Sequence, residues 1–426
     1  MGKKMTLSGK KHTKSFIVAL CAFVYFVSYF SRKDFAAVLV AMTKEGSGVI
    51  TETVGGAIGT GLFICYGIGQ LVSGFLGDRI KPSHLMLSGL SATALCNLLM
   101  PLTSNGYLMI AIWAVNGFAQ AMLWPPIVRI LADNLDHERF VMANLVVTTA
   151  AHISTVILYI YTPLVCLKFY DYKAVFFTAA ILAAVAAAVL IISLIIIIPK
   201  DAIKKPIKKI PTLEKDQSAS YGALVRRAGI IPIFVCIVMM GILRDGIETW
   251  LPTLYSAAFN RNADESILLS VALPIFSIIS IVLIKLLYKT RSFKNEARGT
   301  MILFAAVIAV TVPIFLLITS STLLPRLLCL ILACLVCACM HGVNFLLISC
   351  LPGRFSRYGR AATTSGFCNA FTYVGAAISS YGFAVISKYF GWRMTTLSWM
   401  GVGAVGIIFA LIAYNAYTKF IEENEQ

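Results

Sequence analysis

The chain has 426 residues, of which 59% are hydrophobic and only 13% are charged. Soluble domains carry about 25% charged residues, so this composition excludes an ordinary soluble protein and indicates a polytopic membrane protein. The formal net charge is +17, but the positions of the basic residues indicate membrane topology rather than binding to nucleic acid.

Apolar runs of about 20 residues recur from one end of the chain to the other, and each is long enough to cross ~30 Å of hydrocarbon. A β-barrel would show short alternating segments instead. We therefore expect an all-α polytopic membrane protein. Twelve spans are predicted, at 15–39, 53–76, 83–102, 107–131, 140–167, 175–198, 230–258, 266–287, 300–319, 323–351, 361–390 and 395–420.

The clearest linker follows the sixth span, at 199–221. It has three prolines, five lysines between 200 and 209, and no long apolar run. Because it divides the predicted spans into six and six, it indicates two homologous bundles. The predicted organisation is an N-terminal six-helix bundle at 1–198, a basic linker at 199–221, and a C-terminal six-helix bundle at 222–426.

Basic residues also cluster before the first span and in alternate loops, whereas the intervening loops carry few. Positively charged loops stay on the cytoplasmic side of a membrane. This pattern places the N-terminus, the linker and the C-terminus in the cytoplasm, in a multi-pass protein of the plasma (inner) membrane. No cleavable signal peptide is predicted, because the first apolar run continues directly into Arg32, Lys33 and Asp34.

The first span holds Arg32, Lys33 and Asp34 well inside its apolar region. A guanidinium in hydrocarbon costs from about 3 to more than ~10 kcal/mol, so it needs a partner, water or a ligand. The first span of the second half has the corresponding pair Arg244 and Asp245. Two-fold related halves would bring both guanidiniums to opposite sides of one central cavity, where each planar fork suits phosphate oxygens.

A different interpretation is that each arginine pairs with a nearby acid. Arg32 would then pair with Asp34 or Asp245, and Arg244 would pair with Glu248 one helical turn later. The two interpretations are compatible, because acids can hold the arginines when no ligand is bound. Asp34, Asp245 and Glu248 are therefore candidate charge partners.

Histidines lie inside two further spans. His152 falls in the middle of the fifth span, where an imidazole could tune phosphate binding or carry a proton. The alternative is a histidine that is hydrogen-bonded at a helix interface. We interpret His341, in the tenth span near Asn344, in this second way.

Aromatic residues and prolines mark other positions of interest. The paired prolines that follow Trp124 predict a break or kink in the fourth span, and direct contact between Trp124 and a substrate is the alternative. Tyr29, Tyr66 and Tyr373 could donate hydroxyl groups to a ligand, or they could be packing aromatics.

The sequence lacks the motifs of several common catalytic and metal-binding sites. We find no P-loop, no metal-ligand cluster and no nucleophile elbow, so we expect neither an enzyme, nor a metal, nor a cofactor. The eleven cysteines fall in apolar spans and are interpreted as small packing residues. Because nothing indicates ATP hydrolysis, uphill transport would draw on a gradient.

Five segments resemble the organophosphate:phosphate antiporter family of the major facilitator superfamily. They are Tyr-Phe-Ser-Arg-Lys-Asp-Phe at 29–35, Tyr-Gly through Gly-Asp-Arg at 66–79, Gln-Ala-Met-Leu-Trp-Pro-Pro-Ile-Val-Arg at 120–129, Leu-Arg-Asp-Gly-Ile-Glu-Thr-Trp-Leu-Pro at 243–252, and Ser-Gly-Phe through Tyr-Val-Gly-Ala at 365–376. The resemblance implies the major facilitator fold. It also implies exchange of a sugar phosphate or glycerol phosphate for inorganic phosphate by alternating access.

In that family an arginine of the first helix and one of the seventh bind the substrate phosphate, and they match Arg32 and Arg244. A fifth-helix histidine, which matches His152, assists them. The glycerol-3-phosphate transporters also carry a second-helix lysine where this chain has Gln70, so one positive charge is missing. The predicted substrate site comprises Arg32, Arg244, His152, Tyr29, Tyr66, Gln70, Lys33, Trp124 and Tyr373.

Two other functions remain open from the sequence. The same arginines could serve a membrane receptor that senses an external sugar phosphate without net transport, or a carrier of another organic anion, because arginine also binds carboxylates. The expected partners are the organophosphate, inorganic phosphate and the lipid bilayer, with no nucleic acid. We expect a monomer, since the fold does not demand a protein partner.

Overall fold

The computed structural model describes residues 7–43, 49–135, 137–169, 171–196, 221–288, 290–320, 322–358 and 361–425. Within these ranges the chain forms helices and no strands. The predicted linker lies outside the described residues, apart from Tyr221 at the start of α8. The proposed division into two bundles at that linker therefore stays a prediction.

The helices before the linker are α1 (Leu7–Thr43), α2 (Glu52–Arg79), α3 (Pro82–Leu99), α4 (Gly106–Gln120), α5 (Trp124–Asn134), α6 (His137–Phe169) and α7 (Lys173–Ile196). Those after it are α8 (Tyr221–Arg227), α9 (Ile230–Phe259), α10 (Ala263–Leu269), α11 (Ala272–Leu287), α12 (Arg291–Lys294), α13 (Glu296–Leu317), α14 (Leu323–Asn344) and α15 (Ala361–Glu425). A short 3₁₀ turn, Met100–Leu102, follows α3.

Eleven helical segments in the described ranges are long and apolar enough to cross a membrane, one fewer than the twelve predicted. The difference lies in α15, which runs through both of the last two predicted spans. Gly391, with φ 78° and ψ 168°, breaks the helical geometry within α15 and divides it into two arms. Glycine tolerates this positive φ, which carries a steric cost for other residues.

The kink predicted in the fourth span is confirmed. α4 ends at Gln120, the chain makes a turn, and α5 begins at Trp124 with proline at its first positions. Proline is well tolerated there, because the first helical N–H groups have no partner within the helix. The turn changes the direction of the chain beside the central cavity described below.

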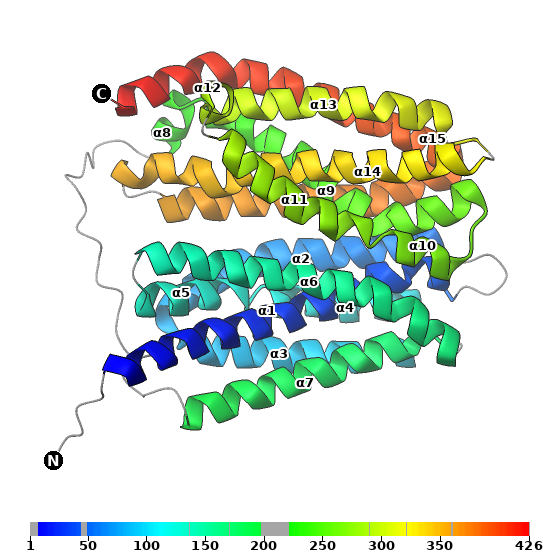
Figure 1. The fold of residues 1–426 in the computed structure, drawn as a ribbon, viewed down its shortest axis with the longest axis horizontal. Helices are drawn as coiled ribbons and strands as arrows, with labels where there is room; N and C mark the ends of the chain where they lie inside the picture. Colours follow the sequence, from blue (N-terminus) through cyan, green and yellow to red (C-terminus); the bar gives the residue numbers. More distant parts are fainter. Residues whose placement is uncertain are drawn as a thin grey trace.

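Figure 1 shows α1–α7 lying together on one side of the molecule and α8–α15 on the other, with the long helices running side by side. α1 begins and α15 ends at the same end of the molecule, on the left of this view. Contacts between distant segments, chiefly α15 with α9 and α2, and α1 with α6, hold this arrangement together.

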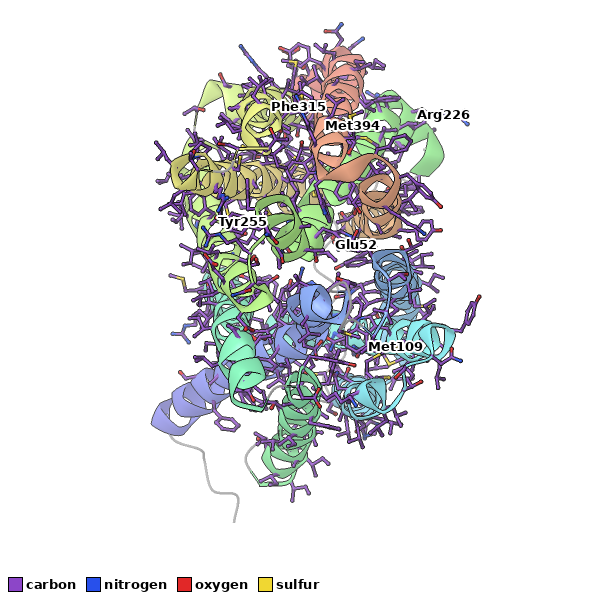
Figure 2. The ribbon with its side chains drawn as sticks, turned by 90° about the vertical axis from the view of Figure 1, so that its right-hand side faces the viewer. Glu52, Met109, Arg226, Tyr255, Phe315 and Met394 are labelled. Atoms are coloured by element: carbon purple, nitrogen blue, oxygen red, sulfur yellow. The ribbon has the colours of Figure 1, made fainter. Side chains whose placement is uncertain are left out.

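The two sides of the molecule are hydrogen-bonded at the opposite end. Ser380 Oγ on α15 donates to the Gly56 carbonyl oxygen on α2 at 3.1 Å, and Ser387 Oγ donates to Glu52 Oε2 at 2.8 Å. Figure 2 looks onto this end and shows Glu52 where the two sets of helices meet. We call this region the closed end.

α14 does not stop as a plain α-helix. It continues as one π-helical segment, Phe345–Cys350, and then as a 3₁₀ segment, Leu351–Tyr358. π-Helical turns are rare and often lie at functional sites. This one directly follows Asn344, which contacts an arginine of the candidate site.

Glycines allow α9 and α15 to approach each other closely. A Cβ placed on Gly375 would lie 2.2 Å from the Val238 carbonyl oxygen, and one on Gly241 would lie 2.3 Å from the Thr372 carbonyl oxygen. Small residues at such contacts let the backbones of membrane helices pack directly.

The substitution Gly375→Ala is therefore expected to destabilise the protein by about 1–3 kcal/mol, because the added methyl group forces the two backbones apart. The melting temperature of the detergent-purified protein measures this effect. Gly401→Ala is the matched control on the same helix, since a Cβ at Gly401 has nothing within 4 Å. Equal melting temperatures for the two variants would contradict the close approach.

Candidate functional site

A central cavity of about 790 Å³ lies between the two sides of the molecule. Helices α1, α2, α5 and α6 line it from one side, and α9, α11, α14 and α15 line it from the other. Its lining includes every predicted substrate-site residue and two of the three candidate charge partners: Tyr29, Arg32, Lys33, Tyr66, Gln70, Trp124, His152, Arg244, Asp245, Glu248 and Tyr373.

Arg32 enters this cavity from α1 and lies against aromatic rings. Its guanidinium carbon is 4.3 Å from the centroid of the Tyr29 ring and 5.0 Å from that of Tyr66. Such cation–π contacts stabilise a desolvated cation. No hydrogen bond or ion pair joins Arg32 to another residue within the described ranges, and its buried Nε has no acceptor. The donors of Arg32 are thus available to a ligand.

Arg244 on α9 is held differently. Its Nη1 donates to Asn344 Oδ1 at 2.7 Å, and its Nη2 donates to Asp245 Oδ2 at 2.7 Å. The side chain of Arg244 is 12% exposed and that of Asp245 is 7% exposed. The predicted pairing of Arg244 with a nearby acid is thus realised with Asp245, its neighbour in sequence, rather than with Glu248.

Asp34 does not join the site. It is fully buried, and its Oδ1 accepts a hydrogen bond from the backbone N–H of Phe35 at 2.7 Å. The interpretation that Asp34 pairs with Arg32 is therefore wrong. The reason is helical geometry, since residues two apart on an α-helix point to different faces.

Lys33 reaches across the molecule instead. Its Nζ donates to Glu248 Oε2, which joins α1 to α9. The other oxygen of the same carboxylate, Oε1, lies 2.8 Å from His341 Nε2 on α14. Because a carboxylate oxygen only accepts, His341 donates its Nε2–H to Glu248.

His341 was interpreted from the sequence as a histidine of a helix interface, but it also lines the central cavity. Its ring centroid is 5.8 Å from that of His152 on α6. The spacing of Cys337 and His341, one turn apart on α14, places both beside Glu248, with Cys337 Sγ 3.8 Å from Glu248 Oε1. In the sequence, the i, i+4 spacing of Cys337 and His341 is the feature that could have predicted their position on one helix face.

These three side chains form a potential metal-ligand group that the sequence did not predict. The donor atoms of Glu248, Cys337 and His341 all lie within 4.8 Å of one another. Thiolate, imidazole and carboxylate are common zinc ligands. However, Lys33 already occupies the other oxygen of the carboxylate, so the local charge of this cluster does not require a metal cation.

His152 lines the cavity opposite His341. Its Nδ1 lies 2.8 Å from the Thr148 carbonyl oxygen, which can only accept. Nδ1 therefore carries the proton, and Nε2 is left for another partner. The Tyr29 ring centroid lies 6.5 Å from that of His152, so the imidazole is close to the aromatic support of Arg32.

Aromatic residues connect the remaining predicted positions. The rings of Tyr66 on α2 and Tyr373 on α15 lie 4.4 Å apart, measured between centroids, and so meet across the two sides of the molecule. Trp124 packs against Tyr25 with a centroid separation of 4.8 Å. Trp124 is thus both a packing residue at the start of α5 and part of the cavity wall.

The cavity extends away from the closed end. Its lining includes Phe140 near the start of α6, Lys285 near the end of α11 and Ser365 near the start of α15. Those helix ends adjoin the loops that the charge pattern assigns to the cytoplasm.

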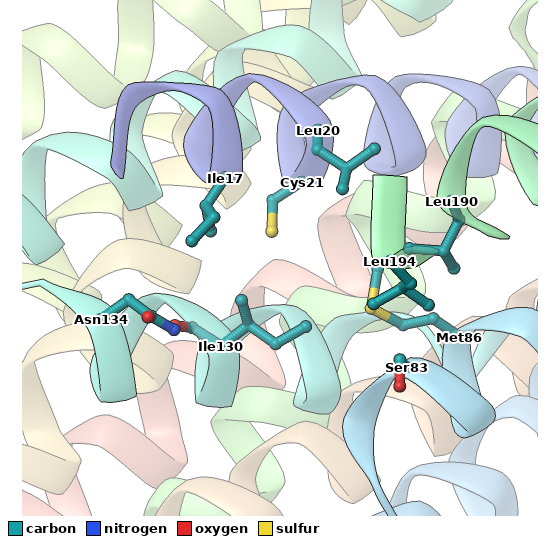
Figure 3. A pocket seen from close by; sticks show the side chains of 9 residues that line it. All are labelled: Ile17, Leu20, Cys21, Ser83, Met86, Ile130, Asn134, Leu190 and Leu194. Atoms are coloured by element: carbon teal, nitrogen blue, oxygen red, sulfur yellow. The ribbon is translucent and has the colours of Figure 1, made fainter. Parts of the chain in front are cut away.

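A second cavity lies elsewhere and has a different character. It is about 20 Å³ in volume and lies among α1, α3, α5 and α7. Figure 3 shows that most of its lining side chains, such as Leu20, Met86 and Leu190, are aliphatic. A space of this size holds about one water molecule, so we interpret it as a packing defect.

Comparison with known proteins identifies the family of this chain. The family model described as Major Facilitator Superfamily matches residues 21–380. The chain belongs to the major facilitator superfamily.

Solved transporter structures share this fold over almost the whole chain. A POT family transporter in complex with 5-aminolevulinic acid covers 95% of this chain and 96% of its own, with a TM-score of 0.73 and 14% identity. A single-site mutant of the nucleoside transporter NupG covers 94% of this chain and 100% of its own, with a TM-score of 0.74 and 12% identity. At these identities the likeness concerns the fold alone.

Curated relatives match over shorter stretches. A "Probable hexose phosphate transport protein" of Chlamydia muridarum is 35% identical over 109 residues, which are 26% of this chain and 24% of the relative. The "Membrane sensor protein UhpC" of Salmonella typhimurium is 34% identical over 107 residues, 25% of this chain and 24% of the relative. The "Glycerol-3-phosphate transporter" of Bacillus subtilis is 31% identical over 162 residues, 36% and 35%. The matches thus span about a quarter to a third of the relatives' lengths.

In this major facilitator superfamily protein, the contact between Lys33 and Glu248 is expected to stabilise the folded state. Lys33→Met leaves the Glu248 carboxylate, which is 17% exposed, without its counter-charge, and this costs up to about 3–5 kcal/mol. Replacing both residues, as in Lys33→Met with Glu248→Met, should recover most of that loss. Melting temperatures of the two single variants and the double variant form the cycle that measures it. Strictly additive effects would show that the two side chains do not interact.

Proposed function

We propose that this protein is a secondary transporter that exchanges a phosphorylated metabolite for inorganic phosphate by alternating access. The phosphate group binds between Arg32 and Arg244, with one arginine from each side of the molecule. The observation that carries this proposal is the Arg32 guanidinium, which has no hydrogen bond or ion pair to another described residue, in a cavity that also contains Arg244. A guanidinium inside a membrane-spanning region without an acid favours an anion, and its planar fork suits phosphate oxygens.

The charges along the cavity wall support an anionic substrate. Arg32, Lys33, Arg244 and Lys285 line it, against the carboxylates of Asp245 and Glu248. The Tyr29 ring lies beside the Arg32 guanidinium, and the Tyr373 ring packs against Tyr66 in the same cavity, which makes their hydroxyls candidates to donate to the same anion. The Nε2 of His152, which has no hydrogen-bond partner among the described residues, can accept a hydrogen bond from a substrate hydroxyl.

The size of the cavity suits a substrate larger than phosphate. Ligand pockets for small molecules typically measure ~300–1,000 Å³, and the central cavity measures about 790 Å³. A phosphate group at the two arginines leaves room for a sugar or glycerol moiety. Tyr25 and Trp124 offer an aromatic surface to that moiety, and Gln70 offers an amide that can donate or accept a hydrogen bond.

The two arginines also link binding to movement. Arg32 and Arg244 come from opposite sides of the molecule, so an anion that neutralises both draws the two sides together around itself. Closure there favours opening of the hydrogen bonds at the closed end, including Ser380 to Gly56. A ligand shifts such an equilibrium only by its differential affinity for the two states, and contact with both arginines supplies that difference.

The family relatives support the substrate class. The names of the hexose phosphate and glycerol-3-phosphate transporters described above both specify a phosphorylated metabolite. Their similarity to this chain covers only part of its length. We further propose that the chain lies in the plasma membrane as a monomer with both termini in the cytoplasm. The common end at which α1 begins and α15 ends agrees with an even number of crossings.

A second candidate function is a membrane receptor that binds an external sugar phosphate without net transport. The likeness to the sensor protein UhpC favours it. The same cavity and arginines would bind the ligand, and the two functions differ only in flux. Binding of sugar phosphates without uptake or exchange in proteoliposomes would identify the receptor.

Replacing the arginines should abolish exchange. Arg32→Lys and Arg244→Lys each lose the bidentate fork, and we expect at least about thirtyfold weaker phosphate binding, equivalent to ~2 kcal/mol. Exchange of labelled phosphate in proteoliposomes, against a panel of sugar phosphates, glycerol phosphates, phosphonates and carboxylates, measures the effect.

Arg226→Lys is the matched control, because Arg226 is exposed on α8. Full exchange by the Arg32→Lys and Arg244→Lys variants would overturn the two-arginine site. Transport of a carboxylate alone by the wild-type protein would overturn the substrate class.

A further inference from the structure

Helices α2 and α15 meet in an antiparallel arrangement beside the central cavity. Thr60 Oγ1 on α2 donates to the Ala377 carbonyl oxygen on α15 at 2.8 Å. Further along α2, the ring of Tyr66 lies 4.4 Å from that of Tyr373, measured between centroids. The residue numbers rise along α2 while they fall along α15, so successive turns of one helix face successive turns of the other.

The next turn of each helix places a side-chain amide in the cavity wall. Gln70 lies four residues after Tyr66 on α2, and Asn369 lies four residues before Tyr373 on α15. Residues four apart share a face of an α-helix, so the antiparallel register sets Gln70 opposite Asn369. Both residues line the central cavity, one from each side of the molecule.

The two amides have no partner in the part of the chain that the structure describes. The side chains of Gln70 and Asn369 make no hydrogen bond to another residue there. An amide offers both donors and acceptors, and a polar group away from bulk water is unfavourable unless it is hydrogen-bonded. Ser365, one turn before Asn369 on α15, adds a hydroxyl group to the same wall. The amides and this hydroxyl thus offer neutral donors and acceptors to a ligand.

The amides lie close to Arg32. The Tyr66 ring centroid is 5.0 Å from the guanidinium carbon of Arg32, and Gln70 follows Tyr66 by one helical turn, about 5.4 Å along the axis. This turn leads away from the closed end, in the direction in which the cavity extends. A group esterified to a phosphate at Arg32 can therefore extend toward Gln70 and Asn369.

Hydroxyl groups are the ligands that match such a pair of amides. A hydroxyl donates one hydrogen bond and accepts others, as an amide does, so one amide can bond to neighbouring hydroxyls of the same molecule. A second phosphate would favour a cation rather than a neutral amide. Glycerol phosphate has few hydroxyls on a short chain, whereas a sugar presents several of them around a ring and can meet amides from two helices.

We propose that Gln70 and Asn369 form a subsite for the hydroxyl groups of a sugar, so that a sugar phosphate is preferred to glycerol phosphate. This rests on the proposed function. The phosphate lies between Arg32 and Arg244, and the sugar extends from it along α2 and α15, with one amide on each side. The amides contact the organic part of the substrate, whereas the arginines contact its phosphate.

Competition for phosphate exchange tests this subsite. Proteoliposomes that contain inorganic phosphate take up labelled phosphate, and unlabelled glucose-6-phosphate, glycerol-3-phosphate or phosphate competes with it. We expect glucose-6-phosphate to compete with the wild-type protein at lower concentration than glycerol-3-phosphate. For Asn369→Leu and for Gln70→Met, the half-inhibitory concentration of glucose-6-phosphate, divided by that of phosphate for the same variant, should rise about tenfold, the effect of one lost hydrogen bond.

Asn415→Leu is the matched control, because Asn415 is exposed in the second arm of α15. The same ratio for this variant should equal that of the wild-type protein. Dividing by the value for phosphate removes any effect of a substitution on the amount of active protein.

Deoxy analogues of glucose-6-phosphate, each lacking one hydroxyl, show whether the contact is direct. The analogue that lacks the hydroxyl bound by Asn369 should compete more weakly than glucose-6-phosphate with the wild-type protein. With Asn369→Leu the two compounds should compete equally, because the amide partner is already gone. A purely structural role of Asn369 would leave the penalty for the missing hydroxyl unchanged, which overturns the subsite.

Other results also decide the matter. A wild-type protein that exchanges phosphate but binds glycerol-3-phosphate as well as glucose-6-phosphate overturns the sugar subsite and leaves the two-arginine site intact. Unchanged ratios for both amide variants overturn it too, even if exchange is slower, because the amides then act in the movement of α2 against α15. A wild-type protein that exchanges no phosphate contradicts the proposed function instead.

Variants that lose all exchange do not end the comparison. The wild-type protein alone then decides, through the same series of deoxy analogues. At least one analogue should compete more weakly than glucose-6-phosphate, and equal competition by every analogue overturns the proposal.

Discussion

The cost of desolvating a positive charge governs the centre of this protein. Three cations stand where apolar helices pack, and each is stabilised in its own way. Arg244 has an adjacent carboxylate and an amide, through Asp245 and Asn344. Lys33 has a carboxylate from the other side of the molecule. Arg32 has, among the described residues, only the faces of tyrosine rings. The least compensated of the three is the one most able to accept an anion from outside.

The same electrostatics connects the two sides of the molecule. Two serine hydroxyls hold the closed end, one bonded to the Gly56 carbonyl oxygen and one to the Glu52 carboxylate, whereas an ion pair joins α1 and α9 at the centre. Single hydrogen bonds of this kind contribute about 1–3 kcal/mol each. A molecule held in this way can change its opening without unfolding any helix.

Much of the fold could be predicted from the sequence, because each span is a local apolar run of the right length. Arg32, Arg244 and His152 could also be selected, since buried polar residues are conspicuous in apolar helices. Asp34 was misassigned, although the angle between residues two apart on a helix argued against its pairing with Arg32. The contact between Lys33 and Glu248 joins residues 215 positions apart, and no local pattern encodes it. Gly391 interrupts α15 through one positive φ angle, which single-sequence reasoning cannot assign among 30 glycines.

The π-helical segment after Asn344 determines which of the following side chains point into the cavity. In an α-helix, two residues five apart point in directions that differ by about 140°. In a π-helix, whose hydrogen bonds join residues five apart, they point in more similar directions. Asn344 and Ser349 accordingly both line the cavity. The π-helical turn contains one extra residue. Deleting that residue would rotate the side chains that follow it by about 100° around the helix axis, and polar side chains of the cavity wall would then face neighbouring helices. A deletion or insertion here would change which side chains face the cavity, even if none of the residues that now line it were substituted.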